Sequence, residues 1–186
     1  MEIRITKVTS WKDVLNAARF TQRKVPLDKE PSDDFKKNIV RAEHSPLRCL
    51  MFNIDLYDIP RFVSDHLVRH IHAQPFVSTG RQDIVQELPS RHEQRMDDLY
   101  NMRLFLNAQE IINISKVRLC THAEAMTRKT WQQVINELYK QEPVLATACV
   151  PNCIYRNMCP ELKCCGYINT DAYLLAREEY CNTLMQ

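Results

Sequence analysis

Residues 107–123 read NAQEIINISKVRLCTHA, and no other stretch of the chain says as much about how it folds. Polar residues recur there at helical spacing, among them Asn107, Asn113 and Arg118, inside an otherwise apolar sequence. An unpaired donor or acceptor on a buried helix face costs about 1–3 kcal/mol. We therefore expect these side chains to have partners, and a bound anionic ligand is one way to supply them.

A second stretch, residues 69–81, reads RHIHAQPFVSTGR and joins a histidine-rich segment to one of only two glycines in the chain. Apolar residues upstream of it recur at helical spacing, which predicts a helix capped by Asp58 with His66 and His70 on its buried face. Pro75 ends this helix, because proline disfavours helical geometry in the residue before it. His66 and His70 also have the spacing of two zinc ligands, but no acidic residue completes such a site.

Local patterns predict the other elements. Strands are expected over 1–8 and 47–57, with short extended structure over 76–85. Ser10 with Asp13, and Ser32, are the residue types that cap helix N-termini. The helices expected in addition to the one after Asp58 cover 10–24, a segment from 32 onward, 90–104, 107–120, 121–141 and 170–184.

The composition narrows the possible functions. A chain of 186 residues with 45% hydrophobic content suits a single domain, 1–186. A net charge of +2 gives no support for nucleic-acid or membrane-surface binding, and no apolar run approaches the ~20 residues that cross a bilayer. The N-terminus lacks the apolar stretch of a signal peptide, so we expect a cytoplasmic protein. Two glycines are too few for a phosphate-binding glycine loop, so side chains and helix ends would hold any nucleotide.

Both stretches resemble the flavin-dependent thymidylate synthases, whose signature reads roughly RHRxxSxNExSxRY and is followed by an NAR…N…LR…HAQ block. The residues that match without gaps are Arg69, His70, Thr79, Gly80, Arg81, Asn107, Asn113, Arg118, His122 and Ala123. Two upstream pieces match in the same order: residues 17–21 (AARFT) resemble the AARxS of the family, and residues 43–46 (EHSP) resemble its EH-containing turn. The resemblance covers roughly residues 14–130.

The sequence also departs from this signature. This chain has Ile71, Gln74, Phe76, Val77, Gln82 and Gln109 at the positions where the family has Arg, Ser, Asn, Glu, Tyr and Arg, respectively. The connection from Arg81 to Asn107 looks shorter than in the family. Replacing the Asn-Glu pair by Phe76-Val77 removes polar contacts beside the expected nucleotide, and sites built on hydrogen bonds reject mismatched groups strongly.

The resemblance implies an α+β fold in which an antiparallel sheet packs against long helices, assembled as a homotetramer with active sites between subunits. It implies FAD-dependent transfer of a one-carbon unit from methylenetetrahydrofolate to carbon 5 of a pyrimidine deoxynucleotide, dUMP becoming dTMP. NADPH would supply the reducing equivalents.

The resemblance also implies a role for individual residues. Arg118 would lie against the pyrimidine and stabilise negative charge that develops on the ring. Thr79, Gly80 and Arg81 would bind the substrate with it, since a guanidinium suits phosphate and carbonyl oxygens. The flavin-binding residues would be Arg69, His70, His44, Thr21, Asn107 and Asn113.

Simpler roles compete with these. Each arginine could form a salt bridge at a subunit contact, His70 could be a hydrogen-bonded core residue, and Asn107 could cap a helix. The chain as a whole could modify carbon 5 of another pyrimidine nucleotide, for example by hydroxymethylation. It could also be a catalytically silent nucleotide-binding or structural homologue, or a small nucleic-acid-binding domain, against which the near-neutral charge argues.

Cysteines are concentrated near the C-terminus, in the segment 149–181. In a cytosolic chain such a cluster suggests metal ligation before disulfides. Four thiolates could bind zinc or an iron–sulfur cluster, although the spacing fits no standard run, and free buried thiols remain an alternative. The predicted metal ligands are Cys149, Cys153, Cys159 and Cys164.

Overall fold

A computed structural model describes residues 1–185 and contains a four-stranded antiparallel sheet. In spatial order its strands are β1 (Glu2–Lys7), β2 (Met51–Pro60), β4 (Leu99–Asn107) and β3 (Gln74–Val77). Every second residue of β2 and β4 is buried, because successive side chains of a strand point to opposite faces. One face of the sheet thus presents a continuous apolar surface to the helices, formed by Phe52, Ile54, Leu56, Met102, Leu104 and Leu106.

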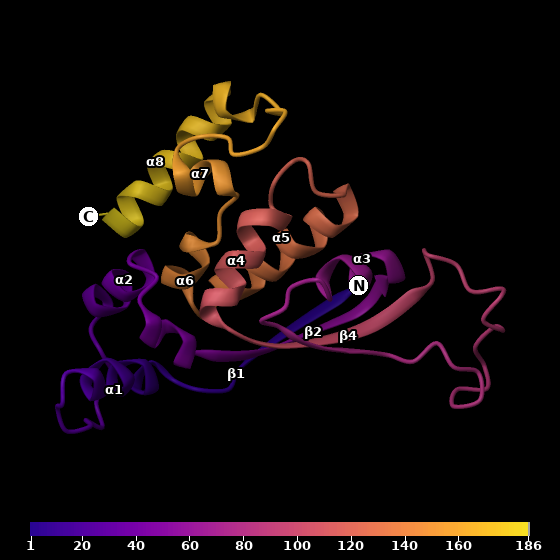
Figure 1. The fold of residues 1–186 in the computed structure, drawn as a ribbon, viewed down its shortest axis with the longest axis horizontal. Helices are drawn as coiled ribbons and strands as arrows, with labels where there is room; N and C mark the ends of the chain where they lie inside the picture. Colours follow the sequence, from indigo (N-terminus) through magenta and orange to yellow (C-terminus); the bar gives the residue numbers. More distant parts are fainter. Residues whose placement is uncertain (186) are drawn as a thin grey trace.

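The helices are α1 (Trp11–Thr21), α2 (Asp33–Arg41), α3 (Arg61–Leu67), α4 (Ala108–Arg118), α5 (Ala125–Tyr139), α6 (Pro143–Ala148), α7 (Asn152–Arg156) and α8 (Asp171–Met185). Two 3-10 turns, η1 (Ser45–Cys49) and η2 (Tyr167–Asn169), complete the elements. Helices α3 to α8 lie on one side of the sheet, and its other face is uncovered (Figure 1). The expected α+β fold with an antiparallel sheet is confirmed.

The helix starts predicted at Ser10, Ser32 and Asn107 are confirmed. Ser10 and Asp13 form a capping box at α1, and the Ser32 hydroxyl accepts the Phe35 N–H at α2. Asn107 caps α4, since its side-chain oxygen accepts the Glu110 N–H at 2.9 Å. Each cap satisfies a backbone donor that has no partner inside the helix.

The predicted helix over 90–104 is wrong. Residues 99–107 form β4, and residues 78–98 form a long connection that extends beyond the end of the sheet (Figure 1). The alternation of Met102, Leu104 and Leu106 with polar residues is a period-two pattern, which indicates a strand with one buried face.

The boundary between β2 and α3 also differs from expectation. Asp58 adopts the left-handed conformation, with φ of 54°, at an irregularity in the strand pairing, and therefore does not cap a helix. Its backbone N–H donates to the Asn101 side-chain oxygen at 3.1 Å. The helix starts at Arg61 instead and ends before His70. No helix within residues 1–185 is long and apolar enough to span a bilayer.

Candidate functional site

Arg118, the last residue of α4, is bound to the C-terminal end of α3. Its Nε donates to His70 Nε2 at 2.9 Å, and its Nη2 donates to the His66 carbonyl oxygen at 2.5 Å. Burial lowers the pKa of the Arg118 guanidinium, and the nearby charge of Arg69 lowers it further. Arg118 is thus a partly desolvated cation with a fixed orientation, and its remaining donors are available for a ligand.

His70 is neutral at pH 7. Burial, followed by the charge of Arg118, lowers its pKa to about 4. Because Nε2 accepts a hydrogen bond from Arg118, the single imidazole proton is on Nδ1. That nitrogen lies 4.0 Å from the Oε1 atom of Glu110, whose side chain is 5% exposed.

Glu110 connects this centre to a polar cavity of about 420 Å³, which we call the amide cavity. The Asn113 amide donates to Glu110 Oε2 at 3.1 Å, and the Gln109 amide donates to Asn113 at 3.3 Å and to Glu43. Four amides, a carboxylate and two basic side chains thus border one space. The residues that line the amide cavity are Arg48, Ile71, His72, Gln74, Asn107, Gln109, Glu110 and Asn113.

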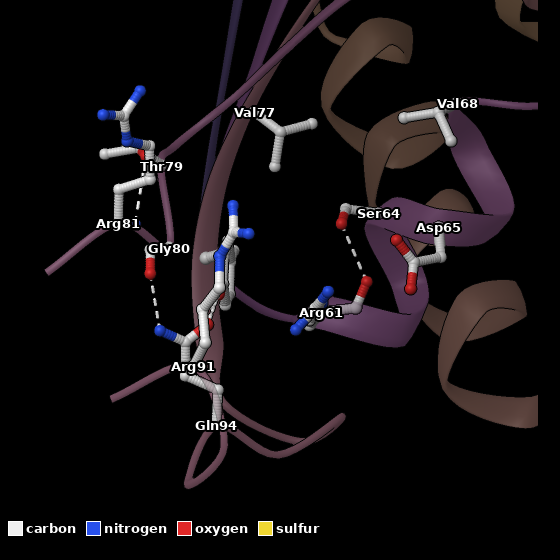
Figure 2. A pocket seen from close by; sticks show the side chains of 11 residues that line it. Arg61, Ser64, Asp65, Val68, Val77, Thr79, Gly80, Arg81, Arg91 and Gln94 are labelled. Carbon is white, nitrogen blue, oxygen red and sulfur yellow. Dashed lines mark hydrogen bonds between the residues drawn. The ribbon is translucent and has the colours of Figure 1, made fainter. Parts of the chain in front are cut away.

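A second cavity, of about 600 Å³, lies between α3 and the connection that follows β3, and we call it the arginine cavity. Arg61 and Asp65 line it from α3, while Arg81 and Arg91 line it from the connection (Figure 2). The guanidinium of Arg61 lies over the Tyr100 ring, 5.9 Å from its centroid. The other lining residues are Ser64, Val68, Val77, Thr79, Gly80, Gln94 and Tyr100.

Gly80 lies against the ends of two side chains in this cavity, which would have to shift to admit a Cβ atom. A Cβ atom there would lie 2.6 Å from the Tyr100 hydroxyl and 2.7 Å from the Gln94 side-chain oxygen. The Gly80 carbonyl accepts from the Gln94 amide at 2.5 Å, so this close approach organises the cavity wall (Figure 2). Arg81 is exposed and forms a two-point ion pair with Asp83, with an Nη2–Oδ2 distance of 2.5 Å.

The predicted site residues therefore fall into separate groups. Asn107 and Asn113 line the amide cavity, and His70, beside Glu110, is bonded to Arg118, with the charge of Arg69 nearby. Thr79, Gly80 and Arg81 line the arginine cavity. On β4, Tyr100 of the arginine cavity and Asn107 of the amide cavity lie near opposite ends, whereas on β3 Val77 and Gln74, which line the same two cavities, are three residues apart.

Two predicted residues have no described contact with either group. Thr21 lies at the exposed end of α1, where its hydroxyl donates to the Ala18 carbonyl at 2.8 Å. His44 is exposed and precedes η1. The carboxylate of the preceding residue, Glu43, accepts from the Gln109 amide and from Lys116, the latter at 2.6 Å. His44 is therefore next in sequence to a residue that contacts a lining residue of the amide cavity.

Sequence reasoning missed several cavity residues. Glu110 could have been found, because a carboxylate in an apolar helix face requires partners. Arg48, Arg61 and Arg91 carried no such signal, since an isolated arginine on a surface is ordinary. Only the tertiary structure brings them to the cavities.

The predicted set of four cysteine ligands is not brought together. Cys149 is in the core, where its thiol donates to the Leu145 carbonyl and burial raises its pKa to about 12. Such a thiol resists the deprotonation that metal binding requires. Cys120, Cys153, Cys159 and Cys165 instead line one small cavity, and all eight cysteines are free thiols.

No model of a known protein family matches this sequence, and no curated protein matches it significantly. Solved structures do match it in three dimensions. A flavin-dependent thymidylate synthase from Helicobacter pylori, complexed with FAD and dUMP, gives a TM-score of 0.69 at 14% identity, covering 81% of this chain and 100% of that one. A second structure of this synthase with FAD and dUMP gives a TM-score of 0.69 at 14% identity, with coverages of 81% and 99%.

The UMP/dUMP methylase PolB from Streptomyces cacaoi, bound with 5-Br dUMP, is a further match. Its TM-score is 0.58 at 14% identity, covering 79% of this chain and 94% of that one. At this level of identity the similarity shows that the chain shares the fold of these enzymes.

Proposed function

We propose that this protein transfers a one-carbon unit from methylenetetrahydrofolate to carbon 5 of a pyrimidine deoxynucleotide, using FAD and NADPH, with dUMP as the substrate and dTMP as the product. The shared fold supports this proposal, because the matching structures are named for thymidylate synthesis and dUMP methylation. The observation that carries it within this chain is the partly buried Arg118, held by a neutral histidine beside a cavity lined with amides.

The amide cavity suits a flavin. Amide groups can both donate and accept, which matches the alternating donors and acceptors at the edge of an isoalloxazine ring. Asn107 and Asn113 line this cavity, and His70 lies beside Glu110, which also lines it. These three are the proposed cofactor-binding residues, with Arg69, His44 and Thr21 added by the resemblance. FAD would supply the redox chemistry of the reaction, while the protein binds and orients it.

The proposed role of Arg118 is electrostatic. A cation whose hydration has been partly removed interacts more strongly with charge that develops nearby, because solvent screens it less. Its bonds to the His70 ring and to the His66 carbonyl oxygen fix the guanidinium before substrate arrives, so little reorganisation is needed when the pyrimidine ring becomes electron-rich. We therefore assign Arg118 as the catalytic residue and a contact to the pyrimidine.

The arginine cavity suits the nucleotide phosphate. Arg81 with Thr79 and Gly80 would bind it, assisted by Arg61 and Arg91 of the same cavity. Binding would require the Arg81 guanidinium to exchange its contact with Asp83 for the phosphate. Such an exchange is inexpensive for an exposed ion pair, which contributes only about 0–1 kcal/mol.

The presence of two separate cavities supports assembly as a homotetramer with shared active sites. A nucleotide and a flavin that react must be in contact, but within one chain the two cavities are separate and share no lining residue. A second copy can bring its arginine cavity to the amide cavity of the first. The uncovered face of the sheet offers a surface for such contact, since it exposes Phe76, at 63%, beside the Asp55–Arg103 ion pair.

Val77 favours a second candidate within the same chemistry. It lines the arginine cavity where the family signature has a glutamate, whereas Phe76 lies on the opposite face of the sheet. An apolar wall beside the base changes which base edge is accepted. C5 modification of another pyrimidine nucleotide, hydroxymethylation included, is therefore the alternative.

The decisive experiment incubates the purified protein with FAD, NADPH and methylenetetrahydrofolate and with either dUMP or dCMP. Mass spectrometry of the nucleotide then identifies the group added and the accepted base. A methylated dUMP supports the main proposal, and a modified dCMP supports the alternative. Unchanged nucleotides, together with no binding of added FAD, would leave the silent homologue as the remaining explanation.

A further inference from the structure

We propose that Cys120, Cys153, Cys159 and Cys165 bind a thiolate-ligated metal centre, either a zinc ion or an iron–sulfur cluster. These four side chains line one cavity of about 150 Å³. Four cysteine thiolates are a ligand set used by structural zinc sites and by iron–sulfur clusters alike. The site is separate from both the amide cavity and the arginine cavity.

The four cysteines come from three separate segments of the chain. Cys120 follows the end of α4, Cys153 is on α7, and Cys159 and Cys165 lie in the loop between α7 and η2. A metal bound to all four would crosslink this loop to the helices that carry Arg118 and the C-terminal elements. Metal binding of this kind contributes directly to folding free energy.

An unpartnered polar atom in the same cavity is an independent sign that something binds there. The Asn152 side-chain oxygen is buried and has no hydrogen-bond partner within the described part of the chain, and Asn152 lines the cavity. Leaving such an acceptor without a donor costs about 1–3 kcal/mol. A water ordered beside the bound centre would supply that donor, since four thiolates leave no position for water on the metal itself.

The loop over 157–166 has little of its own to stabilise it. It contains neither a helix nor a strand, and Met158 and Leu162 are exposed at 57% and 109%. Its hydrogen bonds to the body of the protein include that between the His122 ring nitrogen and the Lys163 carbonyl oxygen at 2.8 Å, and that from the Tyr173 hydroxyl to the Asn157 side-chain oxygen at 3.0 Å. A segment without a hydrophobic core gains the most from a covalent or metal crosslink.

The spacing of the sulfur atoms bears on the kind of centre. Among residues 1–185, no three His, Cys, Asp or Glu side chains are arranged to hold one ion. An iron–sulfur cluster is larger than a single ion and would fill the cavity between the thiols, whereas zinc would require the loop to close. In both cases each thiol releases its proton as the metal–sulfur bond forms. An iron–sulfur cluster also requires iron and inorganic sulfide as reactants.

The test measures metal content in untagged protein purified under reducing, oxygen-free conditions from cells supplied with zinc and iron. We expect about one zinc, or two to four iron atoms with matching sulfide, per chain. Cys165→Ser and Cys120→Ser should lose at least half of this metal. Cys49→Ser is the control, because Cys49 lies in η1 and does not line the cavity, and it should retain the metal.

X-ray absorption at the zinc or iron edge of the wild-type protein gives a second measurement that does not depend on any variant folding. A first coordination shell of sulfur supports the proposal for either metal, and visible absorption with sulfide analysis separates the two. A metal-free wild-type protein, a shell of nitrogen and oxygen, or equal loss of metal in the Cys49 and Cys165 variants would overturn it. Neither measurement depends on flavin binding or on catalysis.

Discussion

At the residue scale, the contact between Arg118 and His70 has the most specific consequences. Arg118 donates to a neutral imidazole, so one side of the guanidinium is fixed without neutralising its charge. Glu110, next to the other imidazole nitrogen, stabilises the Nδ1–H form of His70. The arrangement couples the amide cavity to the proposed catalytic cation.

Arg118→Ala should reduce kcat by about 10²–10³-fold, the usual cost of removing one preorganised electrostatic group. The circular dichroism spectrum and the size of the assembly should be unchanged. Arg41→Ala is the control, since Arg41 is a surface residue of α2 bonded to Asn38. Loss of assembly in the Arg118 variant alone would indicate a mainly architectural role.

His70 should make stability depend on pH. Its pKa is about 4 in the folded protein against an ordinary value of 6.5, so between these values the unfolded chain binds a proton that the folded chain does not. Stability should therefore fall as the pH drops from 6.5 towards 4, and His70→Gln should remove part of that fall. Melting temperatures at pH 7 and pH 5 measure it, with His92→Gln in the exposed connection as the control. If the wild type, His70→Gln and His92→Gln all lose the same melting temperature between pH 7 and pH 5, His70 is not the group responsible.

At the scale of elements, α4 combines two roles at its first turn. Asn107 caps the helix through its side-chain oxygen and also lines the amide cavity. An aspartate can accept the same N–H but cannot donate as an amide does. Substitutions at this position can therefore separate capping from ligand binding.

Asn107→Ala should lose about 1 kcal/mol of stability, or about 2–4 °C in Tm, together with FAD affinity. Asn107→Asp should keep the stability and lose only the affinity, because the cap is preserved while a negative charge replaces the amide. Calorimetric melting and FAD titration measure the two effects. If Asn107→Asp binds FAD as tightly as the wild type, Asn107 is only a cap.

Gly80, in the connection after β3, contacts Gln94 and Tyr100 in the wall of the arginine cavity. Gly80→Ala should displace Gln94 and Tyr100 and weaken nucleotide binding about tenfold or more, with little change in Tm, because the connection is exposed. Calorimetric titration with dUMP measures this, and Ser78→Ala, outside the arginine cavity, serves as the control. An unchanged dissociation constant would remove this cavity from the proposed site.

At the scale of the whole molecule, the proposed activity depends on contacts between copies. Arg81→Ala and Arg118→Ala should each be inactive alone. If one copy contributes Arg81 and another Arg118, mixed assemblies of the two variants should contain some intact sites and recover about a quarter of the activity. Co-refolding followed by an activity assay measures this recovery. Mixtures as inactive as either variant would show that each site is built within one chain.

Local sequence was sufficient for several features. The capping residues Ser10, Ser32 and Asn107 predicted helix starts, because a cap interacts with backbone only three residues away. The motif residues around Arg69 and Arg118 predicted an α+β fold and an antiparallel sheet, which the structure has. The strand β4 was missed although its alternation was present in the sequence.

The grouping of side chains needed the tertiary structure. Chain order does not indicate that Glu110 lies beside His70, that Arg61 and Arg91 border the same cavity, or that Cys120 joins the C-terminal cysteines. These contacts depend on how α3, α4 and the long connection pack, and packing depends on the summed burial of many residues. Capping and strand alternation act between neighbours and can be read along the chain, whereas a site assembled from distant segments exists only once the core has formed.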